Sequence, residues 1–178
     1  MRYNWQQKDW PEFKYDLTGV EDILFALVEK IGQASGLLKG LPENTQTETV
    51  IDLMVSEATK TSEIEGEYLN RRDVVSSIRN NLGLNQQMEQ VRDRKAEGAA
   101  ELMIDVRECY AEALSKEKLF SWHRMIMKGN RRMKADEWRS HEAPMQVVSG
   151  PIGKEKVHYE APPSNRVPEE MKRFVTWF

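Results

Sequence analysis

Apolar residues recur at helical spacing through most of this chain, and one such run is especially regular. Its members are Val50, Ile51, Met54, Val55 and Ala58. Steps of three and four residues place these side chains on one face of an α-helix. A possible capping box at Thr45-x-x-Glu48 precedes the run, and Gly66 follows it. We therefore expect a helix over about 45–66 and a mainly α-helical fold.

Two neighbouring segments carry their own boundary signals. Thr18-x-x-Glu21 reads as a second capping box, and it opens an apolar run that stops near Gly40. Asn70 is a suitable N-cap for a short helix that reaches Gly83. Both segments are therefore predicted to be helical.

Two further helices are expected in the middle of the chain. The first runs from about Met88 through Val91 to Tyr110, and Gly98 inside it costs about 1 kcal/mol of helix stability relative to alanine. The second is capped by Ser115 and stops at Gly129.

The end of the 45–66 helix carries an unfavourable charge. Glu63, Glu65 and Glu67 crowd a helix C-terminus, where the free carbonyls already present partial negative charge. At about 100° per residue, Glu65 falls close to the line of Met54 and Ala58. We expect Glu65 to lie beside the apolar stripe, turned from solvent and in need of a cation.

The pattern changes after residue 144. Val147-Val148 and Val157-His158-Tyr159 are short β-prone runs on either side of a glycine-containing turn, which predicts a β-hairpin. Pro168 suits the first turn of a final helix. The sequence stops at Phe178 inside that helix, and we expect the chain to be a fragment.

Several of these motifs resemble the Fic family of protein adenylyltransferases. Thr61, Glu65 and Gly66 match its inhibitory motif, [Ser/Thr]-x-x-x-Glu-[Gly/Asn]. A second group of segments looks like the family's flap and following helix: Trp138-Arg139, Val147-Val148-Ser149-Gly150, Val157-His158-Tyr159, Ala161-Pro162-Pro163 and residues 167–171. The opening, with Tyr3-x-Trp5 and Trp10-Pro11, is similar to the N-terminal extension of family members that carry their inhibitory helix in cis.

The family's catalytic signature is absent from this sequence. That signature reads His-Pro-Phe-x-[Asp/Glu]-Gly-Asn-Gly-Arg-x-x-Arg, whereas His123, His141 and His158 are followed by Arg, Glu and Tyr. The resemblance therefore implies an N-terminal part that ends before the catalytic helix. It also implies that this chain alone is inactive and contains no catalytic residue.

The resemblance implies a helical bundle of Fic type with a β-hairpin flap. Residues 1–112 would form an N-terminal helical region that includes the inhibitory helix, and residues 113–178 would begin an incomplete Fic core with the flap at about 144–161. The inhibitory residues would be Thr61, Glu65 and Gly66. The flap residues that bind a target would be Val147, Val148, Ser149, Gly150, Val157, His158 and Tyr159.

The implied reaction transfers AMP from ATP to a Ser, Thr or Tyr hydroxyl of a target protein. In the family, the glutamate equivalent to Glu65 pairs with the last arginine of the signature, which otherwise holds the γ-phosphate. ATP and Mg²⁺ would act in the completed enzyme, and neither is expected to bind this chain tightly by itself. The implied partners are a protein substrate and, in a homo-oligomer, a second copy of the chain.

A different class of function remains open from the residues alone. The chain could be a non-catalytic helical interaction module, or an inhibitor that acts on a partner in trans. Reading the gene past codon 178 separates the two interpretations, because the enzyme requires a His-Pro-Phe-type signature there.

The composition argues against several classes of function and localisation. The net charge is −3 and the pI is about 5.7, so the general basic footprint of a nucleic-acid-binding protein is missing. Cys109 is the single cysteine, which suits a reducing cytoplasm and gives no ligand spacing for a metal. No apolar run approaches about 18 residues, so no membrane span is expected. The basic pairs Arg71-Arg72 and Arg131-Arg132 are expected on solvated faces and turns.

Overall fold

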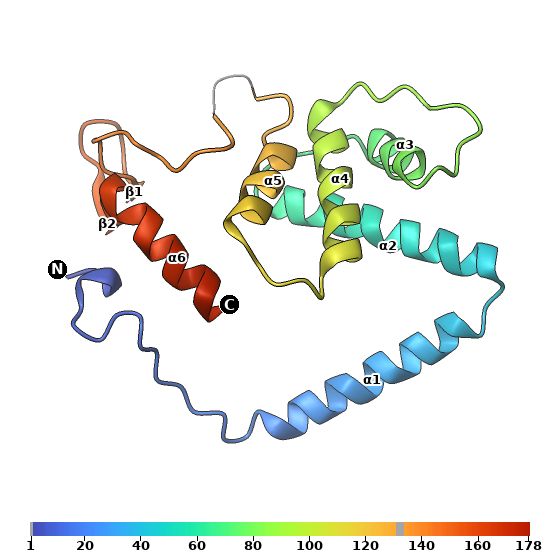
Figure 1. Cartoon of the computed structure of the whole chain (residues 1–178), viewed down its shortest axis with the longest axis horizontal. Coiled ribbons are helices and arrows are strands. Elements are labelled where there is room, and N and C mark those ends of the chain that lie inside the picture. The colour runs from blue at the N-terminus through green and yellow to red at the C-terminus, as the bar shows by residue number, and fades with distance from the viewer. Residues whose placement is uncertain (1, 131–133) are drawn as a thin grey trace. The chain divides into compact units, whose positions relative to one another are not determined.

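The computed structural model describes residues 2–130 and 134–178, and this part of the chain is mainly helical with one small antiparallel sheet (Figure 1). Its elements in chain order are η1 (Asn4–Gln6), α1 (Glu21–Lys39), α2 (Glu43–Ile64), α3 (Arg71–Asn81), α4 (Arg94–Cys109), α5 (Lys116–Ile126), β1 (Gln146–Ser149), β2 (Lys156–Glu160), η2 (Ser164–Arg166) and α6 (Val167–Trp177). The mainly α fold and the single hairpin expected from the sequence are thus confirmed.

The chain divides into two compact units. The first unit combines Met1–Val28 with Trp138–Phe178, and the second unit is Glu29–Glu137. The division falls inside α1, none of whose residues is buried. The domain boundary expected after residue 112 falls inside the second unit, between α4 and α5.

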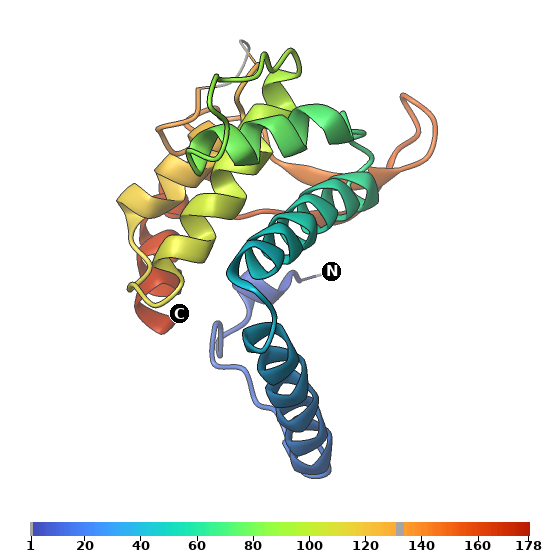
Figure 2. The ribbon, with the colours of Figure 1, turned by 90° about the vertical axis from the view of Figure 1, so that its right-hand side faces the viewer.

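The second unit contains the hydrophobic core, where α3 packs against both α2 and α4 (Figure 2). The stripe of α2 expected from the sequence supplies nearly half of this core. The buried core residues are Ile51, Met54, Val55, Ala58, Val74, Ile78, Ala96, Ala100 and Ile104. Small residues on α4 allow the helix axes to approach closely, because they add little side-chain thickness.

Gly98 lies where α4 approaches the end of α5 closely. A Cβ atom at this position would overlap the carbonyl oxygen of Met125 and lie 2.9 Å from Cβ of Lys128. The glycine therefore serves packing rather than helix stability.

Two of the expected helix caps are confirmed. Asn70 Oδ1 accepts a hydrogen bond from the backbone N–H of Asp73 at 3.2 Å, at the start of α3. Ser115 Oγ accepts one from the N–H of Lys118 at 3.1 Å, at the start of α5. Each cap satisfies one of the backbone donors that have no partner within the helix.

The two predicted capping boxes, at Thr18-x-x-Glu21 and Thr45-x-x-Glu48, are wrong. Helix α2 begins at Glu43, directly after Pro42, so Thr45 and Glu48 lie inside the helix rather than at its start. Helix α1 begins at Glu21, and the hydroxyl of Thr18 donates to Asp16 instead. A nearby carboxylate and a proline pre-set for the helix start both compete with the short capping-box pattern.

The predicted start of the long helix is also wrong. Helix α4 begins at Arg94, so Met88 and Val91 belong to the loop that precedes it. The side chain of Asn80 stabilises this loop through two hydrogen bonds. Its Nδ2 donates to the carbonyl of Glu89, and its Oδ1 accepts from the N–H of Glu89. Hydrogen bonds from side chains to the backbone can stabilise a loop in place of a helix. The spacing of apolar residues does not reveal such bonds.

The first unit joins the N-terminal segment to the hairpin and α6. The indole Nε1 of Trp5 donates to the carbonyl of Glu160 at 2.7 Å. The indole Nε1 of Trp10 donates to Oε2 of Glu170 at 3.0 Å. The two tryptophans therefore tie the N-terminal segment to the end of β2 and to the first turn of α6.

Within the described residues, none of the helices has the length and apolar character needed to cross a membrane. Arg71 and Arg72 are exposed at the start of α3, in agreement with the solvated position expected for them. The pair Arg131-Arg132 lies outside the described residues.

Candidate functional site

The C-terminal end of α2 borders a pocket of about 360 Å³ in the second unit. Its walls come from α2, the segment after it, α4, and the end of α5 with the residues that follow. Thr61 and Glu65, two of the residues singled out in the sequence, line it. The full lining is Ala58, Thr61, Ser62, Glu65, Glu67, Leu69, Lys95, Ala99, Leu102, Met103, Ile126, Met127, Lys128 and Asn130.

Gly66 ends α2 in a specific backbone turn. Its φ of 80° lies in the left-handed region, which favours glycine. The N–H of Glu67 bonds the carbonyl of Ser62 at 2.8 Å, and that of Gly66 bonds the carbonyl of Glu63 at 3.0 Å. These bonds satisfy carbonyls at the helix end as a Schellman-type turn does. The glycine of the motif thus has a structural role of its own.

Glu65 occupies the C-cap position of α2, and its residue is exposed. The expectation that it is turned from solvent is therefore wrong. Burial along the stripe stops at Ala58, the last buried core residue on α2. Periodicity fixes the direction of a side chain on its helix, but it does not fix how far the neighbouring helices extend along that helix. Glu65 consequently lines the pocket as an exposed residue.

The three glutamates at the end of α2 differ in their partners. Glu63 forms an ion pair with Lys60 at 2.7 Å, and Glu67 forms one with Lys95 at 2.5 Å. Among residues 2–130 and 134–178, no side-chain hydrogen bond or ion pair involves the carboxylate of Glu65. A carboxylate at the negative end of a helix without a cation has a favourable site for one beside it.

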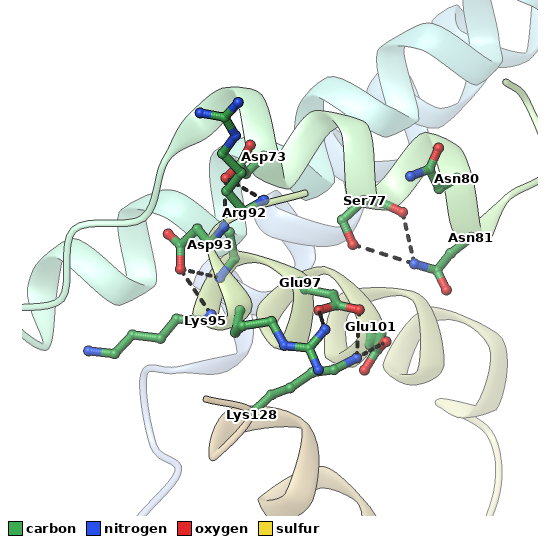
Figure 3. A network of polar contacts seen from close by, with 12 residues as sticks. Asp73, Ser77, Asn80, Asn81, Arg92, Asp93, Lys95, Glu97, Glu101 and Lys128 are labelled. Atoms are coloured by element: carbon green, nitrogen blue, oxygen red, sulfur yellow. Dashed lines mark hydrogen bonds and ion pairs between the residues drawn. The ribbon is translucent and has the colours of Figure 1, made fainter. Parts of the chain in front are cut away.

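Lys128 also lines the pocket, and its ammonium group bridges two acids of α4 (Figure 3). Its Nζ lies 3.0 Å from Glu97 Oε1 and 2.5 Å from Glu101 Oε1. Partial burial lowers the pKa of Lys128, but its bonds to Glu101 and Glu97 outweigh this effect, and the net direction is upward. Lys128 therefore remains a cation whose charge is already balanced.

The expected flap residues lie in the first unit, on the hairpin of β1 and β2. Val147 pairs with Tyr159 and Val148 pairs with Val157, so His158 is the extra residue of a β-bulge. His158 Nε2 lies 2.6 Å from Ser149 Oγ across the hairpin. Gly150 begins the turn with a φ of 107°. All residues of β1 are exposed, so this strand is accessible to another chain.

A polar cluster around Asp105 in the second unit was not predicted from the sequence. The indole Nε1 of Trp122 on α5 donates to Asp105 Oδ2 on α4 at 2.6 Å. That hydrogen bond is the main reason why the pKa of Asp105 lies below its usual value. Cys109 and Glu112 raise the pKa of Lys118, which also lies 3.6 Å from Asp105. The thiol of the buried Cys109 donates a hydrogen bond to the backbone carbonyl of Asp105.

The apolar walls of the pocket were missed as well. Leu69, Ala99, Met103 and Ile126 come from separate segments, and no single periodicity connects them. The small residues around Gly98 were the available signal, because such residues mark places where helices approach closely. Within the described residues, no group of three or more His, Cys, Asp or Glu side chains could hold a metal ion.

Comparison with known proteins gives one family match. A family model described as "Domain of unknown function (DUF4172)" matches residues 3–84. The matched region includes η1, α1, α2 and α3, and thus the Thr61–Gly66 segment with its Schellman-type turn. No curated protein matches the chain.

Proposed function

We propose that this chain is the N-terminal portion of a Fic-type enzyme that transfers AMP from ATP to a protein hydroxyl. In this proposal α2 is the inhibitory helix, and the β1–β2 hairpin is the target-binding flap. The observation that carries the proposal is the end of α2, where the Thr61–Glu65–Gly66 motif coincides with a glycine turn and a carboxylate that lacks a cation among the described residues.

Inhibition follows from competition for one guanidinium group. A Fic-type signature ends in an arginine that holds the γ-phosphate of ATP. Glu65 can accept two parallel hydrogen bonds from such a guanidinium, which is the geometry that favours arginine–carboxylate pairs. An arginine held in this way no longer positions the γ-phosphate, and ATP then loses its productive orientation. ATP and Mg²⁺ would bind chiefly through the signature, which these 178 residues do not contain.

The hairpin supplies a place for the target. Its strands are short and mostly exposed, and Val147 and Val148 are 59% and 47% exposed. An extended target segment can pair with such an edge through main-chain hydrogen bonds. This pairing would hold a Ser, Thr or Tyr hydroxyl of the target in a fixed register for attack on the α-phosphate.

The test uses the product of the whole gene and the present chain side by side. Each is incubated with labelled ATP and Mg²⁺, and label on protein is measured. The proposal expects AMP transfer by the whole product after Glu65→Gly, and none by residues 1–178. Transfer by residues 1–178 alone would contradict it, as would a stop codon directly after codon 178.

The exposed apolar residues of α1 favour a second candidate function, a helical interaction module or a trans-acting inhibitor. Ile23, Val28 and Ile31 are each more than half exposed. A module of this kind would bind a partner protein without transferring AMP. The same labelling experiment separates the two candidates, because the module predicts no transfer from either protein.

A further inference from the structure

We propose that the pocket at the end of α2 binds a small organic cation, with its apolar body against the pocket walls and its positive charge on Glu65. We further propose that this ligand relieves inhibition by α2. The second statement rests on the proposed function, whereas the binding statement does not.

The pocket has the size and lining of a ligand site. Its volume of about 360 Å³ falls within the range of about 300–1,000 Å³ that is common for small-molecule pockets. Half of its lining residues have aliphatic or thioether side chains, including Leu69, Leu102, Met103, Ile126 and Met127. Methionine adapts to ligands of different shape because its side chain is unbranched and polarizable.

The charges around the pocket select a cation. Lys95 is paired with Glu67, and Lys128 is paired with Glu97 and Glu101, so these lysines are already neutralised. Glu65 is the lining carboxylate without an ion pair in the part of the chain that the structure describes. The remaining charge of the pocket is therefore negative, and electrostatic complementarity favours a ligand with one positive group over a neutral or anionic one.

Binding of such a ligand would change the role of Glu65. Its carboxylate would hold the cationic group of the ligand instead of an arginine of the catalytic signature. The arginine would then be available to the γ-phosphate, and AMP transfer would rise. The ligand shifts this equilibrium only to the extent that it binds the released state more tightly than the inhibited one.

The binding test uses the chain itself and two probes of similar size and opposite charge. The probes are 2-phenylethylammonium and 3-phenylpropionate, and the signals are the methyl resonances of Met103 and Met127 at the pocket wall. Met88 is 82% exposed in a loop and does not line the pocket, so its methyl resonance is the internal control. The ammonium probe should shift both pocket methyls and bind at least about tenfold more tightly than the carboxylate probe.

Variants identify the group that holds the charge. Glu65→Gln should weaken binding of the ammonium probe at least about tenfold, whereas Glu63→Gln should leave it unchanged. Both residues are exposed, so both variants should fold. Ala99→Leu narrows the pocket and should also weaken binding. Equal binding of the two probes, unchanged binding to Glu65→Gln, or no shift of the pocket methyls would overturn the proposal.

The regulatory step is tested separately with the product of the whole gene. The ammonium probe should raise AMP transfer by the natural protein and leave the rate of an already active Glu65→Gln variant unchanged. Probe binding together with a transfer rate that does not respond would overturn regulation and leave the proposed function intact. If no form of the protein transferred AMP, the proposed function and regulation would both fail, and the binding result on the chain would stand.

Discussion

Asp73 and Asp93 each hold the start of the other's helix. Asp73 Oδ2 on α3 accepts a hydrogen bond from the backbone N–H of Asp93 at 2.8 Å, directly before α4. Asp93 Oδ2 accepts one from the N–H of Asn70 at 3.2 Å, directly before α3. The two helix N-termini are therefore fixed to each other by a pair of carboxylates, in the orientation that the helix dipoles favour.

Asp93→Ala should destabilise the second unit by about 1–2 kcal/mol, because the substitution removes an N-cap as well as the bond to Asn70. The Asp93 Oδ1 atom caps α4 through the N–H groups of Lys95 and Ala96. Urea denaturation followed by circular dichroism measures the change. Asp52→Ala is the matched control, since its exposed contact with Arg71 at 3.7 Å should contribute less than about 0.5 kcal/mol. Equal effects of the two substitutions would contradict the assigned role of Asp93.

Gly98→Ala should also destabilise the protein, although alanine is the better helix former. The gain in helix propensity is about 1 kcal/mol, and the overlap with Met125 and Lys128 should cost more, giving a net loss of about 1–2 kcal/mol. Gly32→Ala and Gly36→Ala in α1 are the controls, because a Cβ atom there meets nothing within 4 Å. Those two variants should be neutral or stabilised. A stabilised Gly98→Ala variant would show that α4 and α5 do not approach each other in this way.

Stability should fall in acid partly through Asp105. The pKa of this carboxyl is lowered from 3.8 in the folded state, chiefly by the hydrogen bond from Trp122. A group with a depressed folded pKa stabilises the fold above its unfolded pKa, and this contribution is lost as the pH falls through the folded value. Urea midpoints at pH 6 and pH 3 should therefore differ less in Asp105→Asn than in the natural chain. An identical pH dependence in the two proteins would contradict the assignment.

The turn of the β1–β2 hairpin should be an early site of proteolysis. Ile152 is 98% exposed, and Lys154 beside it is exposed as well. Trypsin should cut after Lys154 before it cuts after Lys128, which is half-buried and held by two acids. Mass spectrometry of a brief digestion identifies the order of the cuts. Cleavage at Lys128 first would mean that the hairpin is protected.

The sequence predicted the helices and the hairpin well because those elements depend on local pattern. In the expected stripe, Ile51, Met54, Val55 and Ala58 are buried and Val50 is half-buried. Asn70 and Ser115 cap the helices that they were expected to cap. The capping boxes predicted at Thr18 and Thr45 are absent because a capping box is a short pattern that nearby residues can override. The start of α4 was predicted too early for the same kind of reason, because Asn80 forms hydrogen bonds with the backbone of Glu89 in the preceding loop.

The candidate site was only partly predictable for a related reason. The motif of Thr61, Glu65 and Gly66 is contiguous, so the sequence located the end of α2. The pocket beside it depends on Leu69, Ala99 and Ile126, which the fold brings together from separate segments. The exposure of Glu65 depends on where α3 and α4 stop covering α2, and that is a property of tertiary packing.

The central claim is that Glu65 restrains an AMP transferase, and Glu65→Gly in the product of the whole gene tests it most directly. Label transfer from ATP should rise at least about tenfold, while the exposed position of Glu65 keeps the loss of stability below about 1 kcal/mol. Glu63→Gly and Glu67→Gly should leave transfer nearly unchanged, because their carboxylates are paired with Lys60 and Lys95. Transfer that stays as low in Glu65→Gly as in the natural protein, with equal ATP binding by both, would contradict the account.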